Sequence, residues 1–119
     1  MQHFITSLDT MFAVWNSSDP AEQQRLADQA LDEHVHFVDP NHDIVGRDAF
    51  LAMVGHVQQL IPGAVYARAA GIDVQHDYCR YHWSIHRDGR QLMTGFDVTK
   101  LNDVGRIVQV IGFFGELAR

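Results

Sequence analysis

Apolar side chains recur at three- and four-residue spacing along the first part of the chain, which predicts two amphipathic helices. The first is expected over residues 2–16. The second is expected to begin after Asp19, which can cap it, and to end near Glu33, with Pro20 in its first turn and Glu22 completing a capping box. The inner face of the first helix is unusually aromatic and carries Phe4, Ile5, Leu8, Met11, Phe12 and Trp15.

A short segment of alternating character follows, and it predicts a strand over residues 34–39. Val35, Phe37 and Asp39 share one face of this strand, the face that the alternation assigns to the interior. Pro40 ends the strand because it has no backbone N–H to donate. The pattern therefore places a carboxyl group at the end of a strand, on its apolar side.

Residues 41–43 are predicted as a turn, and helical spacing returns after Gly46. This third helix is expected to end at residues 62–63, where a proline is followed by a glycine. Its inward side chains are expected to be Phe50, Met53, Val54, Val57, Leu60 and Ile61.

The second half of the chain alternates between apolar and polar positions, which is typical of strands. Strands are expected over residues 64–75, 78–87, 91–101 and 106–115. The Asp88-Gly89 pair predicts a tight hairpin between the second and third of them. Three helices followed by a four-strand antiparallel meander indicate an α+β fold, with the sheet curled around the helices.

Composition narrows the class of protein. A chain of 119 residues with 46% hydrophobic and 20% charged residues has the size and composition of one globular domain. The net charge is −6 and Lys100 is the only lysine, so no basic run indicates a nucleic-acid partner. Apolar runs are too short to cross a bilayer, and no basic-then-apolar leader opens the chain, so no membrane partner is expected. Cys79 is the only cysteine, and a reducing cytoplasm is the simplest location.

Asp97 is the second carboxyl group that the pattern singles out. It lies in the middle of a predicted strand, where aspartate is disfavoured by propensity. If its face is the concave one, it joins Met93 and Gly95 in an apolar cavity, and burial there would raise the pKa of its carboxyl group. The alternative is an aspartate that pairs with an arginine or faces solvent.

Tyr81 and Trp83 share the apolar face of the neighbouring strand, so they could wall a pocket for a flat or apolar ligand. Spacing alone does not separate this from a place in the ordinary core. Cys79 lies on the same apolar face, where a thiol is usually inert. The sequence also contains no G-x-S-x-G elbow and no glycine-rich phosphate loop, so we expect no cofactor.

The eight histidines raise the question of a metal site. The pairs His34/His36 and His82/His86 each share a strand face, but neither has a recognised zinc spacing and each lies opposite the apolar face. We therefore expect no metal and place these residues at the surface or an interface. His42 follows Asp39 closely and could reach a pocket mouth as an acid or base.

The order of these elements resembles the nuclear transport factor 2-like superfamily, in particular its SnoaL-like and ketosteroid-isomerase-like members. The likeness covers nearly the whole chain and is carried by residues 35–40, 45–47, 95–97, 105–108 and 112–115. It implies a single domain over residues 1–119, a cone-shaped α+β barrel whose helices cap a curved antiparallel sheet, and a pocket between the two. It also implies a homodimer formed through the outer sheet face, which would give His82, Ser84 and His86 an interface role.

The resemblance also implies roles for the two carboxyl groups. In the isomerase the aspartate before a proline is the general base, and a mid-strand aspartate held protonated binds the oxyanion; these are the positions of Asp39 and Asp97. In SnoaL-like cyclases a mid-strand aspartate near the Asp97 position is the acid–base residue. The isomerase also has a phenol on its first helix, where this chain has Met11, and a thioether cannot donate a hydrogen bond. Tyr66 or Tyr81 could supply a phenol from the sheet.

The leading hypothesis is therefore an enzyme in which Asp39 and Asp97 catalyse isomerisation, cyclisation or dehydration of a small apolar or polyketide-like molecule. Epoxide hydrolysis fits less well, because that activity in the superfamily needs an arginine between two aspartates and neither Arg47 nor Arg80 can be assigned to it. The competing hypothesis is a non-catalytic ligand-binding or dimerising domain; a protein-transport adaptor has less support. The substrate-binding residues are expected to be Met11, Trp15, Phe37, Phe50, Val54, Tyr66, Tyr81, Trp83 and Met93.

Overall fold

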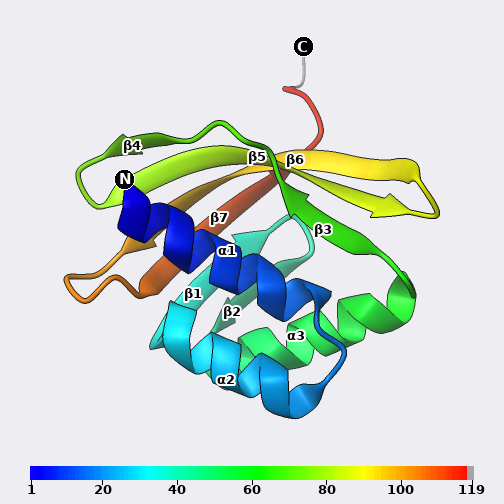
Figure 1. The fold of residues 1–119 in the computed structure, drawn as a ribbon, viewed down its shortest axis with the longest axis horizontal. Coiled ribbons are helices and arrows are strands. Elements are labelled where there is room, and N and C mark those ends of the chain that lie inside the picture. The colour runs from blue at the N-terminus through cyan, green and yellow to red at the C-terminus, as the bar shows by residue number, and fades with distance from the viewer. Residues whose placement is uncertain (118–119) are drawn as a thin grey trace.

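The computed structural model describes residues 1–117 and has an α+β architecture of three helices and one curved sheet. All three helices lie on the same side of the sheet (Figure 1). In chain order the elements are α1 (Gln2–Asn16), α2 (Pro20–Ala30), β1 (Leu31–Asp39), β2 (His42–Val45), α3 (Arg47–Leu60), β3 (Val65–Arg68), β4 (Asp73–Gln75), β5 (Tyr78–Arg87), β6 (Arg90–Leu101) and β7 (Ile107–Phe114).

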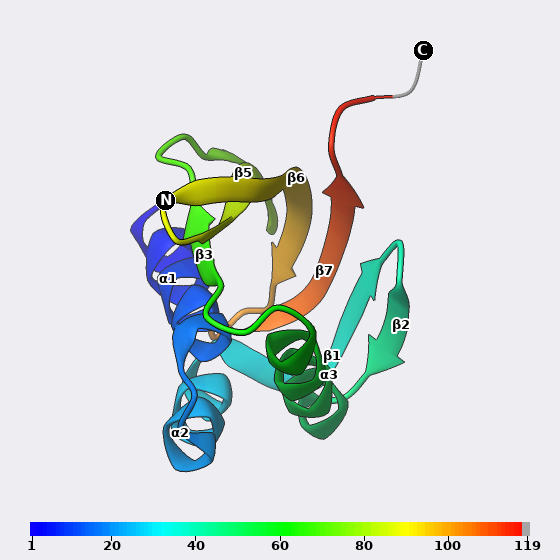
Figure 2. The same cartoon turned by 90° about the vertical axis from the view of Figure 1, so that its right-hand side faces the viewer.

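The sheet has seven strands, six of them in the order β2-β1-β7-β6-β5-β3, with β4 paired to β5. It curls strongly around the helices and does not close (Figure 2). Strands β5, β6 and β7 form the expected antiparallel meander. The expectation of a purely antiparallel sheet is corrected at one place, because β7 pairs with β1 in parallel. Strand β7 is the last strand of the chain and β1 is the first, so two segments far apart in the sequence lie side by side and run in the same direction.

Several element boundaries differ from the predicted ones because pairing within the sheet overrides local propensity. Helix α2 ends at Ala30, and Leu31, predicted as helical, pairs with Ile107 at the start of β1. Residues 42–43, predicted as a turn, belong to β2, which pairs with β1. The strand predicted over residues 64–75 is interrupted between β3 and β4.

Helix α2 begins as predicted at Asp19, whose side chain accepts a hydrogen bond from the N–H of Ala21 at 3.2 Å. The capping box with Glu22 does not form, because the Asp19 N–H donates instead to Ser17 Oγ at 3.2 Å. Helix α3 begins after Gly46, whose φ of 107° is a conformation that favours glycine.

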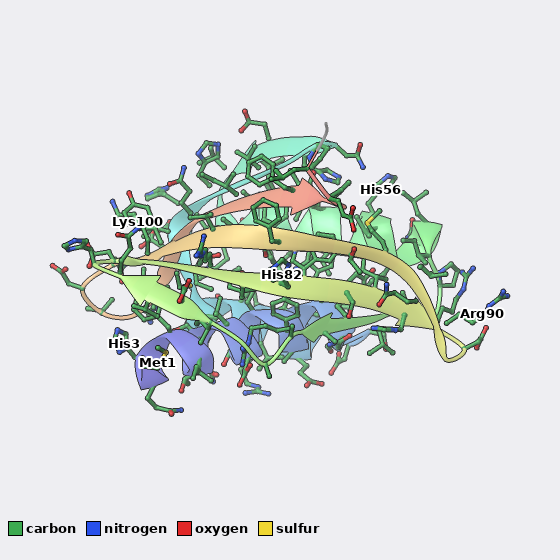
Figure 3. All side chains as sticks on the ribbon, turned by 90° about the horizontal axis from the view of Figure 1, so that it is seen from above. Met1, His3, His56, His82, Arg90 and Lys100 are labelled. Atoms are coloured by element: carbon green, nitrogen blue, oxygen red, sulfur yellow. The ribbon has the colours of Figure 1, made fainter. Side chains whose placement is uncertain are left out.

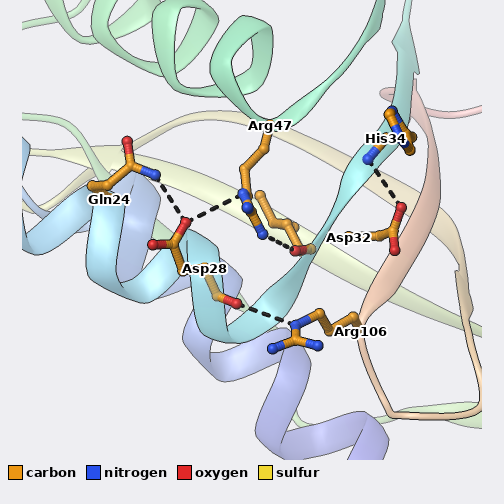
Figure 4. A network of polar contacts seen from close by, with 7 residues as sticks. Gln24, Asp28, Asp32, His34, Arg47 and Arg106 are labelled. Atoms are coloured by element: carbon orange, nitrogen blue, oxygen red, sulfur yellow. Dashed lines mark hydrogen bonds and ion pairs between the residues drawn. The ribbon is translucent and has the colours of Figure 1, made fainter.

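Arg47 anchors the start of α3 to the junction of α2 and β1 (Figure 4). Its Nε lies 3.2 Å from Asp28 Oδ1, and it donates to the Leu31 carbonyl at 3.1 Å. Arg106 reaches the same junction from the loop before β7 by donating to the Asp28 carbonyl at 3.2 Å. These contacts join the start of α3 to the end of α2 and to the start of β1, and they engage the guanidinium group of Arg47 there.

The core lies between the helices and the concave face of the sheet. Helix α3 contributes fully buried Phe50 and Val54, whereas its last residue, Leu60, which was predicted to point inward, is 67% exposed and lies at the border of the molecule's interior. Other fully buried apolar side chains are Leu8, Val14, Ala27, Leu31, Val35, Ile107 and Val110.

Within residues 1–117 no helix combines the length and the apolar character needed to span a membrane.

Candidate active site

A cavity of about 400 Å³ lies between the helices and the concave face of the sheet. Much of its wall is apolar and aromatic, which suits a small apolar ligand. The apolar side chains that line it are Met11, Phe12, Trp15, Phe37, Val57, Leu60, Ile61, Tyr66, Trp83, Ile85, Met93 and Phe114. The polar side chains in the lining are Asp39, Asn41, His42, His56, Ser84 and Asp97.

Asp39 and Asp97 reach this cavity from either side of Gly112. Strand β7 lies between β1 and β6, and Gly112 is directly opposite Asp97 on β6. On the other side Val38 is opposite Ile111, so Asp39 lies level with Gly112. A Cβ atom on Gly112 would be 2.9 Å from Asp97 Oδ1 and 3.5 Å from Asp39 Cβ. Glycine therefore keeps open the space between the two carboxyl-bearing side chains.

Asp97 is buried, with 7% of its surface exposed. Burial raises the pKa of its carboxyl group from 3.8 to about 7, and the negative charge of Asp39 adds to the increase. Contacts from Tyr81 and from Trp83, whose Nε1–H donates to Asp97 Oδ1 at 2.9 Å, act in the opposite direction. No arginine pairs with Asp97 among the described residues. At neutral pH a large fraction of Asp97 carries a proton and can donate it.

Asp39 is held as a hydrogen-bond acceptor by the turn that follows it. Its Oδ1 accepts from the N–H of Asn41 at 2.8 Å and contacts His42 Nδ1 at 2.9 Å. The Asp39 side chain is 10% exposed and that of His42 is 23% exposed. Two donors on one oxygen fix the direction of this carboxylate at the edge of the cavity.

The fold and a recognisable part of the sequence recur in a solved structure. A predicted isomerase of the SnoaL-like family from Agrobacterium tumefaciens is 32% identical to this chain, and the alignment covers 98% of this chain and 100% of that one with a TM-score of 0.90. The chain belongs to the SnoaL-like family. The resemblance inferred from the sequence is thereby confirmed.

Other solved structures share the fold of this SnoaL-like protein. A nuclear transport factor 2-like protein of unknown function from Exiguobacterium sp. 255-15 is 21% identical over 93% of this chain and 99% of that chain, with a TM-score of 0.74. A predicted SnoaL-like polyketide cyclase from Jannaschia sp. CCS1 is 11% identical over 95% and 85% of the two chains, with a TM-score of 0.76. No protein-family model and no curated protein matches the chain.

The SnoaL-like protein has Met11 in the cavity wall on α1, so no phenol reaches the cavity from that position. The two candidate tyrosines of the sheet differ in their surroundings. Tyr81 is opposite Asp97, its hydroxyl lies 2.9 Å from Thr99 Oγ1, and burial raises its pKa well above 10.0. Tyr66 lines the cavity, and its buried hydroxyl has no hydrogen-bond partner within residues 1–117.

Most of the residues expected to bind substrate do line the cavity: Met11, Trp15, Phe37, Tyr66, Trp83 and Met93. Phe50, Val54 and Tyr81 do not; they are packed in the core, where the Phe50 ring meets Phe37 with a centroid separation of 5.6 Å. The spacing of apolar residues along a helix or strand predicts which side chains point into the molecule, but it does not predict which of them pack in the core and which line a cavity.

Sequence reasoning did not anticipate several other cavity residues of the SnoaL-like protein. His56, labelled on α3 in Figure 3, lines the cavity together with Leu60 one turn later. Leu60 was expected to face inward, but His56 was not, and its place one turn before an inward leucine was the usable signal. Gly112 had no local signal, because its role depends on strands β1 and β6 on either side of it.

The histidines predicted at the surface have surface contacts. His36 Nε2 lies 2.7 Å from Asp43 Oδ1, with 39% and 73% of the two side chains exposed. In the part of the chain that the structure describes, no three histidine, cysteine or acidic side chains lie close enough to hold a metal ion. The titratable side chains that line the cavity are Asp39, Asp97, His42, His56 and Tyr66.

Proposed function

We propose that this SnoaL-like protein is an acid–base enzyme that acts on a small apolar or polyketide-like molecule through Asp39 and Asp97. One observation carries the proposal: the two carboxyl groups flank Gly112 in an apolar cavity, and Asp97 has a pKa of about 7. A buried acid that titrates near neutrality beside a second carboxyl group is typical of acid–base sites.

The reaction follows from the different states of the two carboxyl groups. The Asp39 carboxylate takes a proton from a carbon next to a carbonyl group, and the C–H electron pair moves toward the carbonyl oxygen. Protonated Asp97 donates a hydrogen bond or its proton to that oxygen, which stabilises the enol. Return of the proton to another carbon gives isomerisation, attack of the enol on a second carbonyl gives cyclisation, and loss of a hydroxyl as water gives dehydration.

The relatives are consistent with this reaction class. The Agrobacterium protein is named as a predicted isomerase and the Jannaschia protein as a predicted polyketide cyclase. Both names fit the enol chemistry that a base and a protonated acid bordering one gap in an apolar cavity can perform.

Hydrogen–deuterium exchange of 2-tetralone tests the proposal, because exchange at its α-carbon needs only proton removal and enol stabilisation. Followed by proton NMR in deuterium oxide, the rate with the wild-type protein should exceed the buffer rate. Asp39→Asn and Asp97→Asn should each lower the rate constant by about 10²-fold or more. Asp43→Asn is a matched control, since Asp43 lies on β2 with 73% of its side chain exposed. Equal rates for the wild type and both site variants would exclude the acid–base assignment.

The alternative is a non-catalytic ligand-binding or dimerising domain, and one observation on the outer sheet face favours dimerisation. Phe96 and Phe113 stack there with ring centroids 5.0 Å apart, and Phe113 is 47% exposed. His82 packs against Phe96 on the same face, which is turned toward the viewer in Figure 3. We propose that this face joins two copies of the chain in a homodimer, whether or not the protein is an enzyme.

Light scattering after gel filtration tests the dimer. The wild type should have twice the mass of one chain, and Phe113→Glu should have the mass of one chain, because a carboxylate would be buried without a partner at the interface. A wild-type protein with the mass of a single chain at micromolar concentration would rule the dimer out.

A further inference from the structure

Tyr66 on β3 is fixed in the cavity wall from two directions. Its backbone N–H donates to Asn16 Oδ1 at 2.8 Å, and Asn16 Nδ2 donates to the Tyr66 carbonyl at 2.8 Å. The ring packs against Trp15 with a centroid separation of 5.0 Å. Strand β3 runs beside the end of α1, which supplies both of these residues (Figure 2). The end of α1 therefore determines where the Tyr66 side chain lies.

The hydroxyl group of Tyr66 is the one part of the residue that the protein leaves unpaired. Only 8% of the residue is exposed, and the oxygen has no protein partner among the described residues. Buried hydroxyl groups are nearly always hydrogen-bonded, as that of Tyr81 is to Thr99 at 2.9 Å. Burial also raises the pKa of Tyr66, so the hydroxyl keeps its proton at neutral pH and is available as a donor.

Tyr66 and Asp97 lie in different parts of the cavity wall. Tyr66 is opposite Ile85 on β5, whereas Asp97 is opposite Tyr81, four residues away on the same strand. The two residues also pair with opposite edges of β5, because β3 and β6 flank it. A rise of about 3.3 Å per residue and a strand spacing of about 4.8 Å place their Cα atoms roughly 16 Å apart along the sheet. Because the two side chains start this far apart along the sheet, we infer that they reach different oxygen atoms of a ligand.

We propose that the cavity recognises molecules that carry two oxygen atoms at opposite ends of an apolar body, one placed at Asp97 and the other accepting a hydrogen bond from Tyr66. The role of the first oxygen rests on the proposed function, and the role of the second does not. The Tyr66 oxygen is covered in the empty cavity, so contact with a ligand requires a side-chain adjustment in the wall. A hydrogen bond from Tyr66 to the second oxygen favours a polyoxygenated substrate over a ketone with a hydrocarbon tail.

Two naphthols of nearly the same shape test the second oxygen. In 6-acetyl-2-naphthol the hydroxyl represents the enol oxygen and the acetyl oxygen is the distal acceptor, whereas 6-isopropyl-2-naphthol has no distal acceptor. Binding is followed by naphthol fluorescence with the wild type and with Tyr66→Phe. The ratio of the two dissociation constants should change by about five- to tenfold on substitution, through weaker binding of the acetyl compound alone. An unchanged ratio, or binding of neither compound, would overturn the inference.

Thermal unfolding without a ligand distinguishes the proposed role of the Tyr66 hydroxyl from a purely structural one. Tyr66→Phe should keep the wild-type Tm or exceed it, since no protein hydrogen bond is lost, whereas the control Tyr81→Phe should melt lower because it loses the contact with Thr99. A fall in Tm for Tyr66→Phe as large as that for Tyr81→Phe would show a protein partner and contradict the inference.

The first oxygen has its own readout, so the two proposals fail separately. Both naphthols should bind more weakly to the wild type as the pH rises through about 7, where Asp97 loses its proton, and this dependence should vanish in Asp97→Asn. If the dependence is absent while Tyr66→Phe still changes the ratio, the proposed acid–base function fails and the distal contact stands. The reverse result removes the distal contact alone.

Discussion

Asp97 on β6 lies directly opposite Gly112 on β7, and the absence of a side chain at Gly112 keeps the space beside the Asp97 carboxyl group open. Any Cβ at that position would come within 2.9 Å of Asp97 Oδ1, closer than a carbon and an oxygen pack. Asp39 borders the same gap from β1, with its own Cβ 3.5 Å from that point. The glycine therefore sets how closely a ligand can approach both carboxyl groups.

Gly112→Ala should consequently lower the rate of 2-tetralone exchange by about 10- to 100-fold, because the new methyl group displaces the Asp97 carboxyl group and fills the gap. The matched control is Gly55→Ala on α3, where nothing lies within 4 Å of the added Cβ. That variant should keep full activity and gain about 0.5–1 kcal/mol of stability from helix propensity. Exchange at the wild-type rate in Gly112→Ala would show that the gap is not the reaction site.

Trp83→Phe should raise the pKa of Asp97 above its value of about 7. The indole Nε1–H donates to Asp97 Oδ1 at 2.9 Å and stabilises the ionised carboxyl group, and phenylalanine removes that donor while keeping an aromatic ring in the cavity wall. Carbon-13 NMR of the aspartate carboxyl groups measures the change, with Asp97→Asn used to assign the signal. A pKa that falls or stays the same would contradict the contact.

Strand alternation placed Asp97 on the same face of its strand as Met93, because side chains on a strand alternate between its two faces, but it left open whether that face lines a cavity or meets solvent. It could not show that Asp39 and Asp97 flank Gly112. That arrangement depends on the parallel pairing of β1 with β7, between segments far apart in the sequence, for which neither segment has a local signal. The helices were predictable from their apolar period, and the start of α2 also from its cap at Asp19.

The limit of the sequence pattern is also visible at Phe50 and Tyr66. Both are buried aromatic residues, yet Phe50 packs in the core while Tyr66 lines the cavity. The hydrophobic period of a segment reflects burial, and Tyr66 in the cavity wall is buried almost as deeply as Phe50 in the core. Only the packing of α1 against β3, which brings Trp15 onto the Tyr66 ring, distinguishes the two environments.

His42→Ala should reduce exchange of 2-tetralone while leaving the Tm nearly unchanged. The substitution removes the imidazole 2.9 Å from Asp39 Oδ1 but keeps the Asn41 N–H contact, so the carboxylate is less firmly oriented. A fall in rate of about tenfold is expected. His36→Ala is the control, because His36 makes a similar contact with Asp43 at the exposed side of the same strand pair. An equal effect of both variants would indicate a general loss of structure in β1 and β2.

Asp97 should make the protein less stable as the pH rises. Its pKa is about 7 when folded, against an ordinary value of 3.8, so between these values the folded state binds more protons than the unfolded state. Stability gained from Asp97 is therefore fully present below about pH 3.8 and declines up to about pH 7, with a total effect on the order of a few kcal/mol.

Urea unfolding across that pH window measures the effect in the wild type and in Asp97→Asn. In the variant this fall in the free energy of unfolding with rising pH should be absent, because an amide does not ionise. The variant should therefore be the more stable of the two proteins at neutral pH. Groups that do not interact with Asp97 titrate identically in both proteins, so the difference between the two curves reports on Asp97 together with its interaction with Asp39. Parallel curves would mean that the Asp97 carboxyl group titrates near its ordinary value, and the acid role proposed for it would then have no basis.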